Sequence, residues 1–330
     1  MKKFLAVLLS VIMILSVTAF AAAEGEASLR VAVCIAEALG DLGFNDSAAD
    51  GLNALKEDYG VTGSIVECKS DASMFQPALV AAAEENDVVV AVGWQFWDVL
   101  TAVAPQMPDT LFVFVDNGLD GVGENLLSIV YTENEGSFLA GYIAMKVSAT
   151  QSIGFVGGED SETINNFLVG YKQGALYANP EGKVLDPVYV GDYESPDKGK
   201  ESATKLYADG ADVVFAVAGK TGLGVFEAAK EQDKYAIGVD SDQKYIDPDH
   251  IICSMIKDIG GSIYTTVAMY IEDGIFDGGQ IWDADMTTGF VSIGYGEAGM
   301  TQQVSDALKA EVEALAEQII AGEIVVESTR

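Results

Sequence analysis

An alternation of short apolar runs with helical patterns is the feature that most constrains the fold of this chain. Residues 29–35 (LRVAVCI) form an apolar run of strand length, and residues 45–60 place Leu52 and Leu55 on one helical face. Further apolar runs and helical patterns alternate up to residue 115. Because a helix between two strands forms a crossover connection, this pattern predicts an α/β fold with a parallel sheet.

The same order of elements begins again about 120 residues further along the chain. A strand is predicted at residues 152–158, a helix at 163–178, and further strands at 184–190, 212–218 and 235–240. A chain that repeats this order builds two similar doubly wound lobes. The sequence therefore predicts an α/β fold of two parallel-sheet lobes with a hinge between them.

The lobe boundaries follow from the repeat. We expect the first lobe to comprise residues 27–131 with part of 257–300, and the second lobe to comprise residues 132–256. A last helix is predicted at 302–321, where apolar residues recur at helical spacing. It lies in a C-terminal segment, 300–330, that the sequence alone assigns to neither lobe.

The first 23 residues have the three regions of a secretory signal peptide. Lys2 and Lys3 precede an apolar run, and small residues follow it, with cleavage expected after Ala21 or Ala23. The apolar run is shorter than the roughly 20 residues that a membrane span needs, which favours a cleaved signal over an anchor. Since no cysteine ends the run, we expect a soluble exported protein, periplasmic or extracellular and cell-surface, rather than a lipoprotein.

The charge of the chain limits its partners. It has 51 acidic and 18 basic residues, and loss of Lys2 and Lys3 leaves 16 bases and a net charge of −35. Such a surface repels nucleic acid and anionic lipid. We expect no nucleic-acid partner and a monomeric protein.

Cysteine and histidine are scarce. Cys34, Cys68 and Cys253 lie in strand-like apolar runs, and their odd number favours buried free thiols over a disulfide framework. His250 is the single histidine, in a DPDHI turn, which leaves little for a histidine metal site or a Ser-His-Asp triad. The sequence predicts no metal site and no cofactor.

Candidate binding residues come from the loops that follow corresponding strands of the two lobes. In such sheets, ligands bind beyond the carboxyl ends of the strands. The first pair of loops carries Phe44 and Phe167, and two rings from opposing lobes can sandwich a planar ligand. The third pair carries Asp116 and Asp240, whose carboxylates can accept hydrogen bonds from a ribose diol. The alternatives are a helix staple for Phe44, a core position for Phe167 and turn or cap roles for the two aspartates.

The second pair of loops is VGWQFWD (92–98), with Trp94, and AGKTGLG (218–224), with Gly219. The Gly-Lys-Thr run suggests a phosphate loop, but the glycine that such a loop needs falls at Val214. The glycines can still let backbone amides approach a ligand. Lys257 follows the apolar run IICSMI, where a lysine suggests pairing with a buried acid or with a ligand oxygen.

Several motifs together resemble one family. They are GFNDSA (43–48), FVDNG (114–118), ENEGSFLAGYIA (133–144), GFVGG (154–158), GLGVFEAA (222–229), GVDSDQ (238–243) and SMIKD (254–258). The chain resembles the basic membrane protein family of ABC-transporter substrate-binding proteins, whose best-understood type is the purine nucleoside receptor. The resemblance implies a periplasmic-binding-protein-like fold that closes on a nucleoside, and it extends through nearly the whole chain after the signal.

The resemblance also implies roles for single residues. Phe44 and Phe167 match the two rings that hold the base, and Asp240 is similar to the ribose-binding acid. The other positions that match ligand contacts are Asp41, Asn45, Asp116, Gly219 and Lys257, and Trp94 adds bulk near the cleft. One departure is Lys220, which stands where the family usually has a second glycine.

These observations predict an exported solute-binding protein that delivers a nucleoside, with a purine favoured, to the permease of an ABC importer. Hinge closure around the ligand would be the mechanism, and no bond would be broken. Two alternatives remain at this point. One is a sugar or autoinducer binder of the same fold. The other is an exported nucleoside-cleaving enzyme that uses aspartates on a metal or water, although no dense aspartate cluster occurs near a strand.

Overall fold

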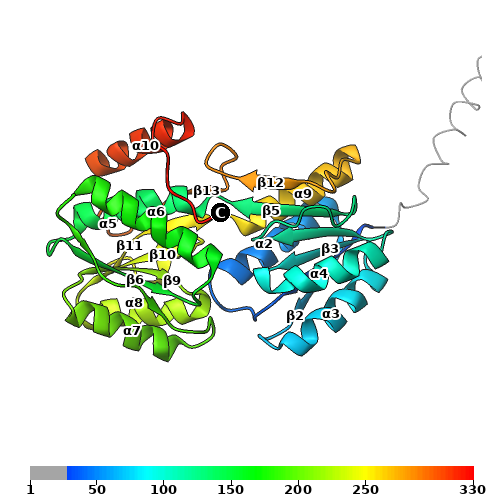
Figure 1. Cartoon of the computed structure of the whole chain (residues 1–330), viewed down its shortest axis with the longest axis horizontal. Helices are drawn as coiled ribbons and strands as arrows, with labels where there is room; N and C mark the ends of the chain where they lie inside the picture. The colour runs from blue at the N-terminus through cyan, green and yellow to red at the C-terminus, as the bar shows by residue number, and fades with distance from the viewer. Residues whose placement is uncertain (1–27) are drawn as a thin grey trace, which may run out of the picture.

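The computed structural model describes residues 28–330, which form two α/β lobes side by side (Figure 1). The predicted signal peptide, residues 1–23, lies outside the described residues. Each lobe has a sheet covered by helices on both faces, so the predicted fold of two doubly wound lobes is confirmed.

The first lobe has a six-stranded, all-parallel sheet in the order β12-β5-β4-β3-β1-β2. The strands are β1 (Arg30–Ile35), β2 (Thr62–Glu67), β3 (Val88–Val92), β4 (Leu111–Val115), β5 (Leu126–Tyr131) and β12 (Ile281–Ala284). The helices are α2 (Phe44–Tyr59), α3 (Ala72–Glu85), α4 (Trp97–Val103) and α9 (Ile259–Asp273). Alternate residues of β1 face opposite cores: Val33 packs in the core that includes α2 and α9, and Cys34 in the one that includes α3 and α4.

The second lobe has a sheet in the order β13-β11-β10-β9-β6-β7, with β8 also paired to β6. All its pairings are parallel except that of β13 with β11. The strands are β6 (Ser152–Gly157), β7 (Lys183–Val184), β8 (Val188–Tyr189), β9 (Val213–Val217), β10 (Tyr235–Asp240), β11 (Ile251–Lys257) and β13 (Val291–Gly294). The helices are α5 (Glu133–Val147), α6 (Glu162–Ala178), α7 (Pro196–Ala208), α8 (Leu223–Glu231) and α10 (Asp306–Ile320).

Two predicted elements differ from the structure. The strand expected at 184–190 is divided into β7 and β8, because Asp186 and Pro187 interrupt it and proline has no N–H for a ladder. The helix expected at 302–321 begins later, at Asp306. Ser305 sets this start, since its hydroxyl accepts a hydrogen bond from the Leu308 N–H at 3.2 Å as an N-cap.

The prediction of buried free thiols is confirmed. All three are free and buried. Cys34 lies in β1 and Cys253 in β11, but Cys68 comes one residue after the end of β2 rather than inside the strand.

The chain passes between the lobes three times. It leaves the first sheet after β5 and enters α5 of the second lobe, it returns from β11 to α9, and it crosses again from β12 to β13. These three crossings form the hinge. The C-terminal helix α10 packs on the second lobe, where Tyr142 of α5 donates a hydrogen bond to Glu311 at 2.8 Å.

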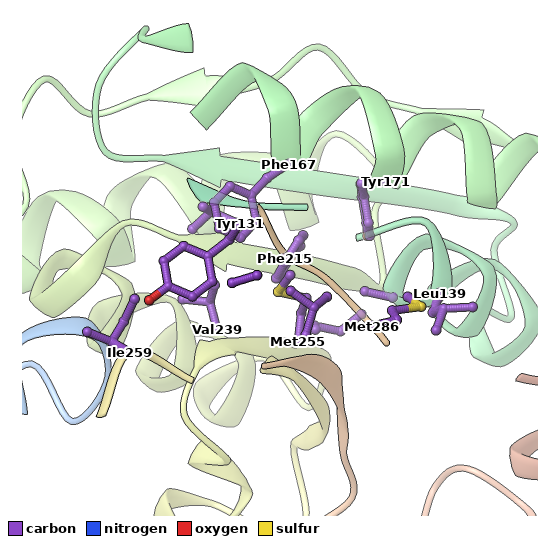
Figure 2. Close-up of a cluster of buried hydrophobic side chains, with 14 of the residues drawn as sticks. Tyr131, Leu139, Phe167, Tyr171, Phe215, Val239, Met255, Ile259 and Met286 are labelled. Atoms are coloured by element: carbon purple, nitrogen blue, oxygen red, sulfur yellow. The ribbon is translucent and has the colours of Figure 1, made fainter. Parts of the chain in front are cut away.

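Helices α5 and α6 approach each other unusually closely. A Cβ on Gly170 would lie 2.0 Å from the Asn134 carbonyl oxygen, and a Cβ on Gly174 would lie 1.8 Å from the Phe138 carbonyl oxygen. Only glycine permits this contact. The close packing fixes α6 and its Phe167, which Figure 2 shows within a cluster of buried side chains that includes Phe215.

Candidate functional site

A cavity lies between the two lobes, at the carboxyl ends of the parallel strands. The space between its walls, open solvent included, is about 570 Å³. The nine residues predicted from the sequence all line it: Asp41, Phe44, Asn45, Trp94, Asp116, Phe167, Gly219, Asp240 and Lys257. Both lobes contribute to this set, so the site depends on their relative position.

Lys257, the last residue of β11, is the central charge of the cavity. Its Nζ lies 2.7 Å from Asp116 Oδ1 and 3.8 Å from Asp240 Oδ1, and its side chain is 3% exposed. Burial alone would lower the pKa of Lys257, but the carboxylates of Asp116, Asp240 and Glu133 raise it above the usual value. The lysine therefore stays charged and pairs with buried acids, as its position after the apolar run IICSMI suggests.

The two aspartates occupy equivalent places in the two lobes. Asp116 follows β4 of the first sheet, and Asp240 ends β10 of the second. Both have left-handed backbone, with φ of 84° and 66° respectively. This conformation is costly for a residue other than glycine, and such strain is concentrated at functional sites. Burial raises the pKa of Asp240 to about 7, although Lys257 opposes the shift.

Two phenylalanine rings from opposite lobes flank the ammonium group. Lys257 Nζ lies 4.8 Å from the ring centroid of Phe44 and 5.1 Å from that of Phe167, so the ring centres are at most about 10 Å apart. Phe44 begins α2 and is half-buried. Phe167 is 1% exposed and packs edge-on against Phe215, with 6.3 Å between centroids. Phe167 is thus both a core residue and a wall of the cavity.

Asp41 organises the loop that carries Phe44. Its carboxylate accepts hydrogen bonds from the backbone N–H groups of Gly43, Asn45 and Asp46, at 3.1, 2.8 and 3.1 Å, so it anchors the N-terminus of α2. It also accepts from Asn45 Nδ2 at 3.0 Å. The other atom of that amide, Asn45 Oδ1, is buried without a hydrogen-bond partner. It is available to a donor on a ligand.

A second polar group in the cavity is one that the sequence analysis missed. Glu37 follows β1, and its Oε1 accepts a hydrogen bond from Gln95 Nε2 at 2.6 Å. Burial raises the pKa of Glu37 to about 7. Gln95 Oε1 and Trp94 Nε1 are buried and have no partner. An acceptor and a donor therefore stand free beside a carboxyl group, an arrangement that suits a planar ligand with both donors and acceptors on one edge.

The position of Glu37 in the sequence could have identified it as a residue of the cavity. It is an acid two residues after an apolar strand, much as Asp116 directly follows β4. Tyr193, Thr163 and Ile164 also line the cavity, but they come from a loop and a helix without a distinctive motif.

Tyr193 brings the second lobe close to the first. Burial raises the pKa of its phenol, and so do the neighbouring carboxylates of Glu159, Glu37 and Asp116, two of which belong to the first lobe. Gly219 lies against the Tyr193 side chain and has φ of +52°, a conformation that favours glycine. The lobes are therefore close together around the cavity.

Lys220 lies at the edge of the same cavity. Its Nζ is 3.6 Å from Glu194 Oε2, and both side chains remain about one third exposed. The lysine thus has a carboxylate partner on its own lobe. Within residues 28–330, no group of three or more histidine, cysteine, aspartate or glutamate side chains is placed to hold a metal ion. Over the same residues, no helix has the length and apolar character to cross a membrane.

Two α/β lobes, a hinge of three crossings and a cavity that both lobes line define a two-lobed solute-binding protein. The family model described as "ABC transporter substrate-binding protein PnrA-like" matches residues 28–330. The chain belongs to this family, and the resemblance inferred from its motifs is confirmed.

Individual relatives agree. Basic membrane protein A1 of Borrelia garinii subsp. bavariensis is 32% identical over 98% of this chain and 96% of its own length. Basic membrane protein C of Borreliella burgdorferi strain B31 is 35% identical over 87% of this chain and 84% of its own length. Among solved structures, an ABC transporter system solute-binding protein from Aeropyrum pernix K1 matches with a TM-score of 0.81 and 27% identity. That match covers 91% of this chain and 94% of the solved one.

Proposed function

We propose that this protein is exported, binds a nucleoside, with a purine favoured, in the cavity between its lobes, and delivers it to the permease of an ABC importer. The observation that carries the proposal is the pair of Phe44 and Phe167, contributed by opposite lobes at about equal distance from Lys257. A flat heteroaromatic ring is the ligand group that two opposed aromatic rings hold best.

The polar groups of the cavity form two clusters, which support a ligand with polar atoms at both of its ends. Asp116, Asp240 and Lys257 form one cluster, which can bind vicinal hydroxyls through carboxylate acceptors and an ammonium donor. Glu37, Gln95 and Trp94 form another, with an unpaired acceptor and an unpaired donor. A ribose at the first cluster and the edge of a base at the second would satisfy both. Neither a free sugar nor a free base has both ends.

Binding would favour the closed arrangement of the lobes. The walls of the cavity belong to two bodies that meet at the hinge, so a ligand that contacts both stabilises the closed state by its extra contacts there. A permease can then distinguish the loaded form from the empty form by its shape. The predicted signal peptide is the basis for placing this exchange outside the cytoplasm.

A thermal-shift and calorimetry panel tests the proposal. Purine nucleosides, pyrimidine nucleosides, free bases, ribose and other sugars are compared at equal concentration. A ligand at 100 times its Kd stabilises the folded state by about 2.7 kcal/mol, which raises the melting temperature visibly. A shift with sugars and none with nucleosides would contradict the assignment. Chromatography of each mixture for released base tests the nucleoside-cleaving alternative.

A further inference from the structure

The segment 324–330, here termed the C-terminal strap, runs along the second lobe toward the hinge. Gln173 of α6 accepts a hydrogen bond from Glu327 N at 2.7 Å and donates one to Val325 O at 3.0 Å. Asn134 Nδ2 of α5 donates to Glu327 O at 3.1 Å. The strap is therefore attached to α5 and α6, the two helices joined by the close glycine contacts, and Figure 1 marks its end between the two lobes.

The last residue of the strap joins elements on both sides of the first crossing. One guanidinium nitrogen of Arg330 donates to the carbonyl oxygen of Tyr131, at the end of first-lobe strand β5, at 3.2 Å. The other donates to Thr163 Oγ1 at 3.0 Å and pairs with Glu133 Oε1 at 3.0 Å. Thr163 also lines the ligand cavity. A single side chain thus connects the first-lobe sheet, the hinge and the cavity wall.

The strap also brings a partly exposed positive charge against a fully buried carboxylate. Glu133 is fully buried, and its Oε2 has no hydrogen-bond partner. Its Oε1 forms an ion pair with the guanidinium group of Arg330 and accepts a hydrogen bond from Asn166 Nδ2 at 3.1 Å. A buried carboxylate needs a paired cation, or it takes up a proton. Glu133 is in turn one of the acids whose field acts on Lys257 in the cavity.

We propose that Arg330 is a positioning residue for the ligand site. It holds the closed arrangement of the lobes by tying Tyr131 to Thr163 across the hinge and by pairing with Glu133 behind Lys257. The inference rests on the proposed function only for the identity of the ligand. Opening the hinge would move the end of β5 relative to α6 and stretch the two bonds that Arg330 makes. A closed state that is stabilised in advance binds its ligand more tightly, because less of the binding free energy is used for closure.

The test measures lobe separation and affinity in the full chain. Spin labels are attached to cysteines introduced at Glu84 of α3 and Glu201 of α7, both exposed and on different lobes. We expect Arg330→Gln to broaden the ligand-free distance distribution toward larger separation and to weaken inosine or guanosine binding about tenfold, within the usual range of coupling effects. Arg330→Lys should restore the charge and part of the affinity, but not the fork geometry.

Arg30→Gln is the matched control. Arg30 is the other arginine of the chain, begins β1, pairs with Asp87 just before β3, and does not line the cavity. It should leave the distance distribution and the affinity unchanged. Thermal melting of each variant separates a general loss of stability from a hinge effect. If Arg330→Gln leaves the separation unaltered and the affinity within twofold, the proposal is wrong. If no nucleoside binds the wild type, the proposed function fails, and the ligand-free distances still decide the role of Arg330.

Discussion

Lys257 and Asp116 form an ion pair that joins the two lobes. Lys257 ends a strand of the second sheet and Asp116 follows a strand of the first, yet Nζ and Oδ1 are 2.7 Å apart with both side chains under 10% exposed. The residues are separated by 141 positions in the chain. The pair therefore links the two lobes inside the cavity, two residues before the chain passes from β11 to α9.

Removing Lys257 from this pair should lower both the stability of the protein and its affinity for the ligand. We expect Lys257→Met to lower the free energy of unfolding by about 3 kcal/mol, since it leaves buried carboxylates without a cation, and to abolish nucleoside binding in calorimetry. The control is Lys244→Met. Lys244 is equally buried but contacts the carbonyl oxygens of Pro248 and Ile251. It should reduce stability while the affinity stays near wild type. Tight nucleoside binding by Lys257→Met would contradict a central role for this lysine.

The two cavity rings should differ in their effect on stability. Phe44→Leu and Phe167→Leu should each weaken purine nucleoside binding by roughly 2- to 12-fold, the value of an aromatic pair. Of these two variants, Phe167→Leu should lower the melting temperature more, because Phe167 is 1% exposed and packs on Phe215. Phe75→Leu, in the other core of the first lobe, should lower stability alone. Equal affinity of all three variants would argue against base stacking.

The sequence predicted the architecture because the central strands are continuous apolar runs. Strands such as β3 and β9 are buried along their whole length, and helices such as α2 have a clear apolar face. The two strands on either side of the third passage between the lobes are harder to predict from the sequence. β12 (IWDA) and β13 (VSIG) have four residues each, mixed polarity and partners distant in the chain. Only tertiary pairing determines them.

The charged candidate residues that end or follow apolar strands could be identified, because a charge at the end of an apolar run is visible in the sequence. Residues that reach the cavity from helices or loops gave weaker signals. Tyr193 follows the short strand β8, and the end of the strap has no motif. Lys257 was placed in the site, but its pairing with Asp116 of the opposite lobe depends on the angle between the lobes. No local pattern encodes that angle.

The raised pKa of Glu37 predicts a pH dependence of stability. Its folded pKa of about 7 exceeds the unfolded value of about 4.3. The stability that it contributes is therefore fully present below about pH 4 and is lost as pH rises through about 7. We expect Glu37→Gln to gain stability over wild type between pH 5 and pH 8, on the order of 1–3 kcal/mol.

Urea denaturation of the ligand-free protein at both pH values measures this difference. Glu84→Gln, an exposed change of the same type on α3, is the control for the high net negative charge and should show no such trend. Asp240, also with a pKa raised to about 7, remains in both proteins and cancels from the comparison. A constant difference between wild type and Glu37→Gln across this range would show that Glu37 ionises normally.

Lys220 is the position where the chain departs from the pattern of its family, and its surroundings predict a small role. Its partner Glu194 is 3.6 Å away, and both groups are partly exposed, so the pair is worth at most about 1 kcal/mol. We expect Lys220→Met, which keeps the bulk, to change the purine nucleoside Kd less than about threefold and stability by less than about 1 kcal/mol. Lys200→Met, which removes a similar exposed pair with Glu231, is the control. A tenfold loss with Lys220→Met alone would mean that the ammonium group turns from Glu194 to the ligand.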